Sequence, residues 1–274
     1  MKQWQHSIVT GAGSGIGLGL AQRLLRRGGR VSVINRSLKD EARALLDEAA
    51  NEGASQWQYL QADVSDEAAL HTVVEAAVQS YGSPDLAINS AGIAVSKTFA
   101  NTPGSEFEHV INVNLNGSAY FAAAVLPYMQ PGSRLALIAS MAGLVSNYGY
   151  SAYGASKFGV VGLATSLRYE YEPLGIGITC VCPPEVHTPM IVAERKPENN
   201  PDPVCLGLKD IVGTLDVDYA CDSILKGIDR GRWMVISGFM ARSTALTARI
   251  LPAAFFAFMR FSIYRLRRKY AVSG

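Results

Sequence analysis

The sequence predicts an α/β fold, a doubly wound domain whose mainly parallel sheet is covered by helices on both faces. Two observations support this prediction. Short apolar runs alternate along the chain with longer helical stretches, which is the pattern of repeated βαβ units. The apolar runs also lack the clean alternation of apolar and polar residues that marks a sheet with one wet face, so both faces are expected to be buried.

Seven apolar runs predict seven strands, at residues 7–10, 30–34, 57–62, 86–89, 134–139, 177–182 and 233–236. Helices are expected between them, two that end near Arg27 and Glu52 and four over 66–80, 104–129, 150–171 and 216–230. No internal repeat or linker divides the series. We therefore expect a single domain over residues 1–240, which includes a loop over 183–217, and a C-terminal tail over 241–274.

The distribution of charge separates the tail from the rest of the chain. The formal net charge of the 274 residues is +2, but residues 230–274 hold nine of the 25 basic residues and none of the 23 acidic ones. The remainder therefore has 16 basic against 23 acidic residues, a net charge of −7. Such a split predicts different partners for the tail and the body.

The N-terminus and the cysteines bear on where the protein works. The first ten residues lack the apolar core of a signal peptide. The four cysteines fit neither a disulfide framework nor a zinc-ligand spacing, so they are expected to be small buried residues in a reducing environment. These features predict a cytoplasmic protein without a metal.

The first candidate binding site is the glycine-rich turn TGAGSGIGLG at residues 10–19. Gly11, Gly15 and Gly17 stand where the first strand gives way to a helix, the context in which a backbone approaches a pyrophosphate at a helix N-terminus. The turn predicts a Rossmann-type dinucleotide site. A purely structural glycine turn is the alternative.

The end of the second strand, VSVINRS, bears on which dinucleotide is bound. Asn35 takes the position at which an NAD site usually has an acidic residue, and Arg36 follows. A guanidinium pairs with a 2′-phosphate, whereas a carboxylate would repel it, so the stretch favours NADP(H). A solvated charge at the strand end is the alternative for Arg36.

The stretch YGYSAYGASKFG at residues 148–159 contains a candidate catalytic tyrosine. A phenol has a pKa of about 10 and needs a nearby cation to act as an acid or base near neutral pH. Side chains four residues apart share one face of a helix. Of the three tyrosines, only Tyr153 has a lysine at this spacing, Lys157.

Together, these motifs resemble the short-chain dehydrogenase/reductase family over residues 7–238. The matching features are the glycine turn, NSAG at 89–92, VNLNG at 113–117, Ser140, and Tyr153 with Lys157. The resemblance implies that Tyr153 donates a proton to a ketone or removes one from an alcohol, with its pKa lowered by Lys157. It also implies that Ser140 holds the substrate oxygen and that Asn114 interrupts its helix to seat a water of the proton relay.

The resemblance further implies the residues that contact NADP(H). They come from the glycine turn, the following strand ends and the catalytic helix: Gly11, Ser14, Gly15, Ile16, Gly17, Asn35, Arg36, Asp63, Val64, Asn89, Ala91, Gly92, Tyr153, Lys157, Pro183, Val186 and Thr188. Pro184 stands where the family commonly has glycine, which stiffens that loop and puts backbone contacts there in doubt. The resemblance also implies a homodimer or homotetramer.

Further stretches bear on the substrate. AGIAVSKTF after the fourth strand, PPEVHTPM and ERKP in the substrate loop, and the basic apolar tail resemble the ketodihydrosphingosine reductase branch, which uses NADPH to reduce the ketone of a long-chain sphingoid base. One alternative is an enzyme for another carbonyl, such as a β-ketoacyl thioester, a steroid or a retinoid. Another is a catalytically silent NADP(H)-sensing protein, against which the presence of all four catalytic residues argues.

The tail contains the apolar run ILPAAFFAFM at 250–259 and the basic run RFSIYRLRRKY at 260–270. A spanning helix needs about 20 apolar residues, so a helix that lies in the membrane interface, on the cytoplasmic side, is predicted instead. Pro252 would lie in its first turn, and the buried side chains would be Phe255, Phe256, Phe258 and Phe261. The alternative is an arm that packs on a second subunit or caps the active site. No recognised nucleic-acid fold is present, so no nucleic-acid partner is expected.

Overall fold

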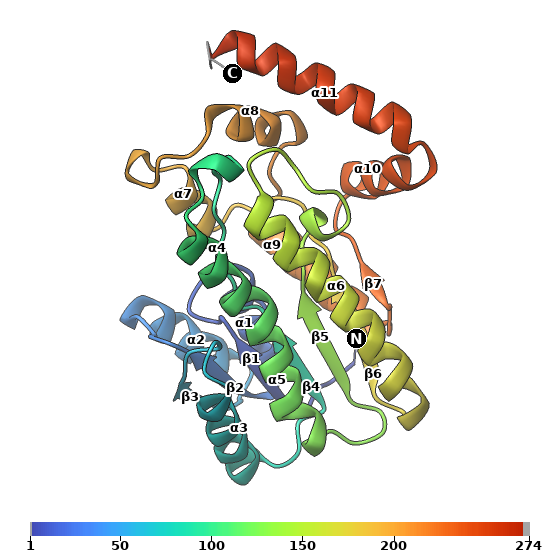
Figure 1. Cartoon of the computed structure of the whole chain (residues 1–274). Helices are drawn as coiled ribbons and strands as arrows, with labels where there is room; N and C mark the ends of the chain where they lie inside the picture. The colour runs from blue at the N-terminus through green and yellow to red at the C-terminus, as the bar shows by residue number, and fades with distance from the viewer. Residues whose placement is uncertain (1, 271–274) are drawn as a thin grey trace.

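A parallel seven-stranded sheet lies between two layers of helices in the computed structural model, which describes residues 2–270 (Figure 1). The strands lie in the order β3-β2-β1-β4-β5-β6-β7, and each neighbouring pair is parallel. They are β1 (His6–Thr10), β2 (Arg30–Asn35), β3 (Trp57–Gln61), β4 (Leu86–Asn89), β5 (Arg134–Ile138), β6 (Gly177–Val181) and β7 (Met234–Val235). The predicted doubly wound sheet is confirmed, with every strand within one residue of its expected bounds.

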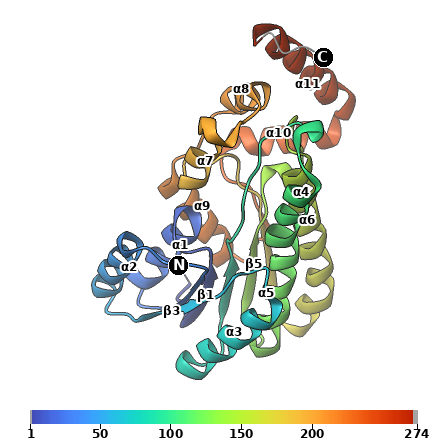
Figure 2. The same cartoon turned by 60° about the vertical axis from the view of Figure 1, so that its left-hand side comes forward.

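Successive residues of β1 belong to different cores because side chains alternate across a strand. Ile8 packs in the core that includes Phe121, whereas Val9 packs in the core that includes Leu24 and Ile224. The helices α1 (Gly15–Arg26), α2 (Asp40–Glu52) and α9 (Val217–Asp229) cover one face of the sheet, and α3 (Glu67–Tyr81), α4 (Gly104–Ile111), α5 (Gly117–Val125) and α6 (Ser151–Tyr171) cover the other (Figure 2). Two buried cores explain why the strands lack polar alternation.

The long helical stretch predicted over 104–129 is not one regular helix. A π-helical turn at Asn112–Asn116 joins α4 to α5, and a short 3-10 turn at Leu126–Tyr128 follows. Buried Asn114 lies in the π turn, where its Oδ1 accepts from Ile93 N (2.8 Å) and its Nδ2 donates to Ile93 O (2.9 Å) and Ser156 Oγ (3.0 Å). The predicted interruption of the helix at Asn114 is therefore present.

The region after β6 is more regular than a loop. It contains α7 (Pro189–Glu194) and α8 (Pro203–Val212), the latter capped by Asp202, whose carboxylate accepts from Val204 N (2.8 Å) and Cys205 N (3.0 Å). Sequence reasoning missed both helices because each is short and packs against the rest of the fold for its stability.

The C-terminal tail forms two helices, α10 (Phe239–Ile250) and α11 (Pro252–Lys269), and α11 lies over α8 and α10 (Figure 1). Pro252 opens α11, as predicted. Between residues 2 and 270 no single helix has both the length and the hydropathy of a membrane span, and α10 and α11 meet that test only as a pair, bent by 117°. The last four residues of the predicted tail, 271–274, lie outside the described residues.

The cysteines are as expected. All four are buried and none forms a disulfide.

Candidate active site

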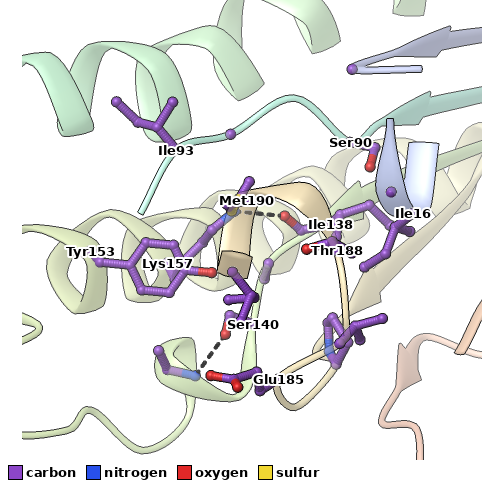
Figure 3. Close-up of a pocket in the computed structure, with 18 of the residues that line it drawn as sticks. Ile16, Ser90, Ile93, Ile138, Ser140, Tyr153, Lys157, Glu185, Thr188 and Met190 are labelled. Atoms are coloured by element: carbon purple, nitrogen blue, oxygen red, sulfur yellow. Dashed lines mark hydrogen bonds between the residues drawn. The ribbon is translucent and has the colours of Figure 1, made fainter. Parts of the chain in front are cut away.

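A cavity of about 1050 Å³ opens at the carboxyl ends of the strands, the edge where doubly wound sheets bind ligands. One end is lined by the glycine turn and the ends of β2 and β3. The other end is lined by α6, the loop after β6, α8 and the tail helices. Figure 3 shows the middle of this cavity, where the candidate catalytic side chains meet.

The glycine turn has the conformation that its sequence predicts. Gly11 and Gly15 have φ angles of +67° and +54°, which favour glycine, and a Cβ on Gly11 would lie 2.6 Å from the backbone N of Ala91. Helix α1 begins at Gly15, and among the described residues the side chain of the N-cap Ser14 caps none of its N–H groups. These N–H groups fit a pyrophosphate.

The ends of β2 and β3 place Asn35, Arg36, Asp63 and Val64 on the cavity. The backbone N–H (2.9 Å) and hydroxyl (2.7 Å) of Ser65 donate to Asp63 and lower the pKa of this carboxyl. The Arg36 side chain is 77% exposed, and its Nη1 lies 3.8 Å from Asp63 Oδ2. This loosely held guanidinium can therefore turn towards a ligand phosphate.

Ser140, Tyr153 and Lys157 meet at the centre of the cavity (Figure 3). Tyr153 and Lys157 lie one turn apart on α6, and Ser140 follows β5. Lys157 is 5% exposed, and its Nζ donates to Ile138 O (3.0 Å) and lies 5.7 Å from the centre of the Tyr153 ring. The Ser140 Oγ accepts from Ala142 N (3.1 Å). The structure thus brings together three of the four predicted catalytic side chains.

The acid–base properties of the pair differ from the sequence expectation. Burial raises the pKa of Tyr153 to about 12, and a hydrogen bond with Ser140 lowers it only in part. Burial lowers the pKa of Lys157 to about 8. The net shift of the Tyr153 pKa is therefore opposite to the lowering expected from Lys157, because burial of the phenol is the largest effect on it. Tyr153 therefore holds its proton at neutral pH.

Three predicted site residues do not line the cavity: Gly17, Asn89 and Asn114. A Cβ on Gly17 would lie 2.3 Å from Gly11 O, so this glycine allows α1 to pack on its own turn. Asn89 accepts from the Thr10 hydroxyl and donates to Ser118 Oγ (2.8 Å) behind the wall.

Asn114 also lies behind the wall, at Gly92. A Cβ on Gly92 would lie 3.2 Å from Asn114 Oδ1 and 3.5 Å from Lys157 Nζ. The absence of a side chain at Gly92 therefore provides the space in which Asn114 and Lys157 approach the cavity.

The remaining predicted contacts line the cavity. Besides those named above, they are Ile16, Ala91, Gly92, Pro183, Val186 and Thr188. Thr188 adjoins the glycine turn, since its methyl carbon would lie 3.0 Å from a Cβ on Gly15. Pro184 does not keep the loop away from the cavity, because both prolines at 183 and 184 lie on its lining.

Sequence reasoning missed a buried ionic network beside Tyr153. Lys209 Nζ lies 2.6 Å from Glu194 Oε2, to which it donates a hydrogen bond. It also lies 2.6 Å from Glu185 Oε2, a contact whose geometry is that of an ion pair without a hydrogen bond. The Tyr150 hydroxyl donates to Glu194 Oε1 (2.8 Å), and its ring lies 5.0 Å from that of Tyr153. The network joins Tyr150, the N-cap of α6, to α7 and α8. No motif marks these residues, which lie 15 or more positions apart except for the pair Glu185 and Glu194.

Burial opposes both charges of the central pair in this network. It lowers the pKa of Lys209 to about 8 and raises the pKa of Glu194, while their 2.6 Å contact favours the ions. Tyr150, Glu185 and Lys209 line the cavity and give the end that α8 and the tail helices line a polar wall.

Beyond the polar wall the lining is mostly apolar, and its polar members on α10 are Ser243, Thr244 and Thr247. Met190 and Ile191 of α7 and Ile211 of α8 contribute to it, together with Met240 of α10 and Phe255, Phe258 and Met259 of α11. The structure thus places the tail at the mouth of the cavity. This agrees with the alternative given for the tail above, an arm that caps the active site.

Comparison with known proteins identifies relatives of this chain. The family described as short chain dehydrogenase matches residues 5–199. The chain is 32% identical over 244 residues to 3-dehydrosphinganine reductase TSC10B of Arabidopsis thaliana, covering 87% of this chain and 71% of that protein. It is 36% identical over 192 residues to 2-(R)-hydroxypropyl-CoM dehydrogenase of Xanthobacter autotrophicus (67% and 75% covered) and 34% identical over 197 residues to 3beta-hydroxysteroid dehydrogenase 2 of Eggerthella lenta (70% and 75%).

Solved structures share the fold. A short chain dehydrogenase/reductase from Burkholderia phymatum, in complex with NAD, has a TM-score of 0.78 at 22% identity, covering 91% of this chain and 95% of that one. A short-chain dehydrogenase from Sphingobium yanoikuyae, in complex with NADPH, has a TM-score of 0.72 at 28% identity, covering 89% and 93%. Similar structures thus contain either dinucleotide.

Proposed function

This chain belongs to the short chain dehydrogenase family, and from that premise we propose that it uses NADPH to reduce the ketone of a long-chain, lipid-like substrate to an alcohol. Membership makes it an oxidoreductase that binds a nicotinamide dinucleotide. The choice of NADPH, the direction and the substrate are the proposal.

The catalytic residues are arranged for reduction. Tyr153, with its pKa raised to about 12, keeps its proton near neutral pH and donates it to the ketone oxygen as negative charge develops there. The Ser140 hydroxyl holds this oxygen and stabilises the charge. When bound, NADPH supplies the hydride that the ketone carbon accepts. Lys157, whose Nζ lies 5.7 Å from the centre of the Tyr153 ring, would hold the ribose of the bound dinucleotide beside the phenol.

The end of β2 supports NADPH. Arg36 is exposed at the cavity, and the preceding Asn35 is uncharged. Lys39 also lines this end. These two cations favour a 2′-phosphate that NADH lacks.

The mostly apolar outer half of the cavity is the observation that carries the substrate proposal. Its lining of methionine, isoleucine and phenylalanine side chains suits an alkyl chain, while Tyr150, Glu185 and Lys209 suit a polar head group beside the ketone. The similarity to a 3-dehydrosphinganine reductase over 87% of the chain agrees with this division. We therefore favour 3-ketodihydrosphingosine among lipid-like ketones.

A second candidate is a steroid or another bulky carbonyl compound. The same wide, apolar mouth would accept it, and one relative is named a 3beta-hydroxysteroid dehydrogenase. A β-ketoacyl thioester or a retinoid would make the same use of Tyr153. A catalytically silent NADP(H) sensor is disfavoured because Asn114, Ser140, Tyr153 and Lys157 are all present.

The test is NADPH oxidation, followed by nicotinamide absorbance, with 3-ketodihydrosphingosine in detergent micelles. The expected result is turnover with NADPH and much less with NADH. Equal rates with NADH would contradict the role of Arg36. No turnover of this ketone, with turnover of a steroid ketone and intact NADPH binding, would replace the substrate proposal with the second candidate.

A further inference from the structure

Exposed apolar side chains concentrate on the two tail helices. Of the 19 large apolar side chains that are exposed among the described residues, ten lie in residues 239–270. They include Phe239 (81% exposed), Ile250 (63%), Phe256 (64%) and Phe261 (64%). A surface of this kind on a folded chain marks a contact with a protein or a membrane.

Helix α11 is apolar on two sides. Phe255 (9% exposed) and Ser262 (6%) face the protein, and Leu266 packs 2.9 Å from the Cβ position of Gly207 on α8. Phe256 and Phe261 point away from that buried face and have no such cover within the described chain. The outward apolar side chains are therefore additional to those that fix the helix in place.

The charge of this surface is of one sign. Helices α10 and α11 carry seven basic residues (Arg242, Arg249, Arg260, Arg265, Arg267, Arg268 and Lys269) and no acidic residue. None of the ion pairs formed between residues 2 and 270 uses them. A helix that lies in the interface of an anionic bilayer typically combines aromatic side chains with basic side chains that form no ion pair within the protein.

We propose that α10 and α11 dock on the surface of an anionic lipid bilayer and that the cavity receives its substrate there. Met240, Phe258 and Met259 line the cavity from the same two helices that present Phe256 and Phe261 outwards. The bend of 117° between the helices fits a hairpin on a surface (Figure 2). An alkyl chain would then pass from lipid to cavity past apolar side chains, a step that rests on the proposed function.

Charge favours a bilayer over a second copy of this chain. A symmetric contact through α10 and α11 would set seven basic residues against seven others with no acidic partner. An anionic leaflet instead attracts each of them.

The test uses the full chain and vesicles without ketone or NADPH. We expect sedimentation with phosphatidylglycerol vesicles but little with phosphatidylcholine, and weaker sedimentation as salt rises. The double variant F256S/F261S and the triple variant R260Q/R265Q/R268Q should each weaken binding at least tenfold. Tyr169→Ser, at a residue 74% exposed at the far end of α6, is the matched control and should bind like wild type.

A second measurement separates entry from anchoring. With ketone dispersed in detergent the F256S/F261S variant should turn over like wild type, whereas with ketone embedded in vesicles its rate should fall about tenfold. Equal vesicle binding by wild type and F256S/F261S would overturn the proposal. So would a fall in oligomeric size of F256S/F261S in sedimentation velocity, which would assign this face to a subunit contact. Vesicle binding without turnover of any ketone would contradict the proposed function and would still support the docking surface.

Discussion

The two ends of the cavity are built by different means. The dinucleotide end is made of strand ends, a helix N-terminus and the backbone of Gly11 and Gly15, in conformations that few other residues adopt. The substrate end is made of side chains from α7, α8 and the tail, held by the buried network around Lys209. The first end depends on local backbone geometry, and the second on contacts between distant parts of the chain. Substrate choice is therefore free to change while the dinucleotide end stays the same.

Tyr153→Phe should have the largest effect, because it removes the proton donor where the two ends meet. We expect kcat to fall about 10³-fold, within the range for loss of a general acid, with the Kd for NADPH unchanged. Stopped-flow turnover and NADPH fluorescence titration measure the two. Tyr148→Phe, on the same stretch but off the cavity lining, is the control and should keep wild-type kcat. Wild-type turnover by Tyr153→Phe would refute the mechanism.

Lys209→Met tests whether the substrate end depends on its ionic network. It leaves Glu194 buried without a cation, while Glu185 keeps its pair with Arg195, so the free energy of unfolding should fall by about 3 kcal/mol. The KM for ketone should rise while the Kd for NADPH stays within about twofold. Urea denaturation and steady-state kinetics give these values. Lys226→Met, at an exposed position of α9, should change stability by less than about 0.5 kcal/mol. An equal loss of NADPH binding would show that the two ends are not independent.

Lys157→Met should stabilise the cofactor-free protein while it abolishes turnover. Burial lowers the pKa of Lys157 to about 8 from 10.5, so the native state holds its charge at a cost of about 3 kcal/mol at pH 7. Methionine loses the hydrogen bond to Ile138 O, worth about 1 kcal/mol, which leaves a gain of about 2 kcal/mol.

The pH dependence of this gain checks its cause. Between about pH 8 and 10.5 the unfolded lysine is protonated and the native one is not, so wild-type stability gains with rising pH relative to the variant. The advantage of Lys157→Met in urea denaturation should therefore shrink from pH 7 to pH 9.5. A constant advantage would contradict the lowered pKa.

Arg36→Gln should have the smallest effect, confined to the dinucleotide end. Loss of a charge-assisted hydrogen bond to a 2′-phosphate, at a side chain 77% exposed, should reduce the preference for NADPH over NADH about tenfold. The ratio of kcat/KM for the two dinucleotides measures it, with the ketone KM as internal control. Arg43→Gln, whose guanidinium lies 4.8 Å above the Tyr59 ring and off the cavity, should leave the ratio unchanged.

The strands and the dinucleotide end were largely predictable. Strand bounds agree within one residue, and Ser14, Arg36 and Thr188 line the cavity as expected. Gly17 and Asn89 were expected by analogy to contact the dinucleotide but lie behind the cavity wall. A motif shows that a residue is near a site, whereas its side-chain direction depends on how neighbouring elements pack.

The sequence by itself determined the doubly wound parallel sheet, the glycine turn and the one-turn spacing of Tyr153 and Lys157. These follow from local patterns: apolar runs, residues able to adopt positive φ, and the four-residue spacing of a helix. Only the tertiary structure decided that Lys209 meets Glu185 and Glu194 and that α11 lines the cavity. Burial in the tertiary structure also raises the pKa of Tyr153, opposite to the direction that the Tyr–Lys spacing predicts. These properties depend on which distant segments exclude water from a side chain, and no local pattern records that.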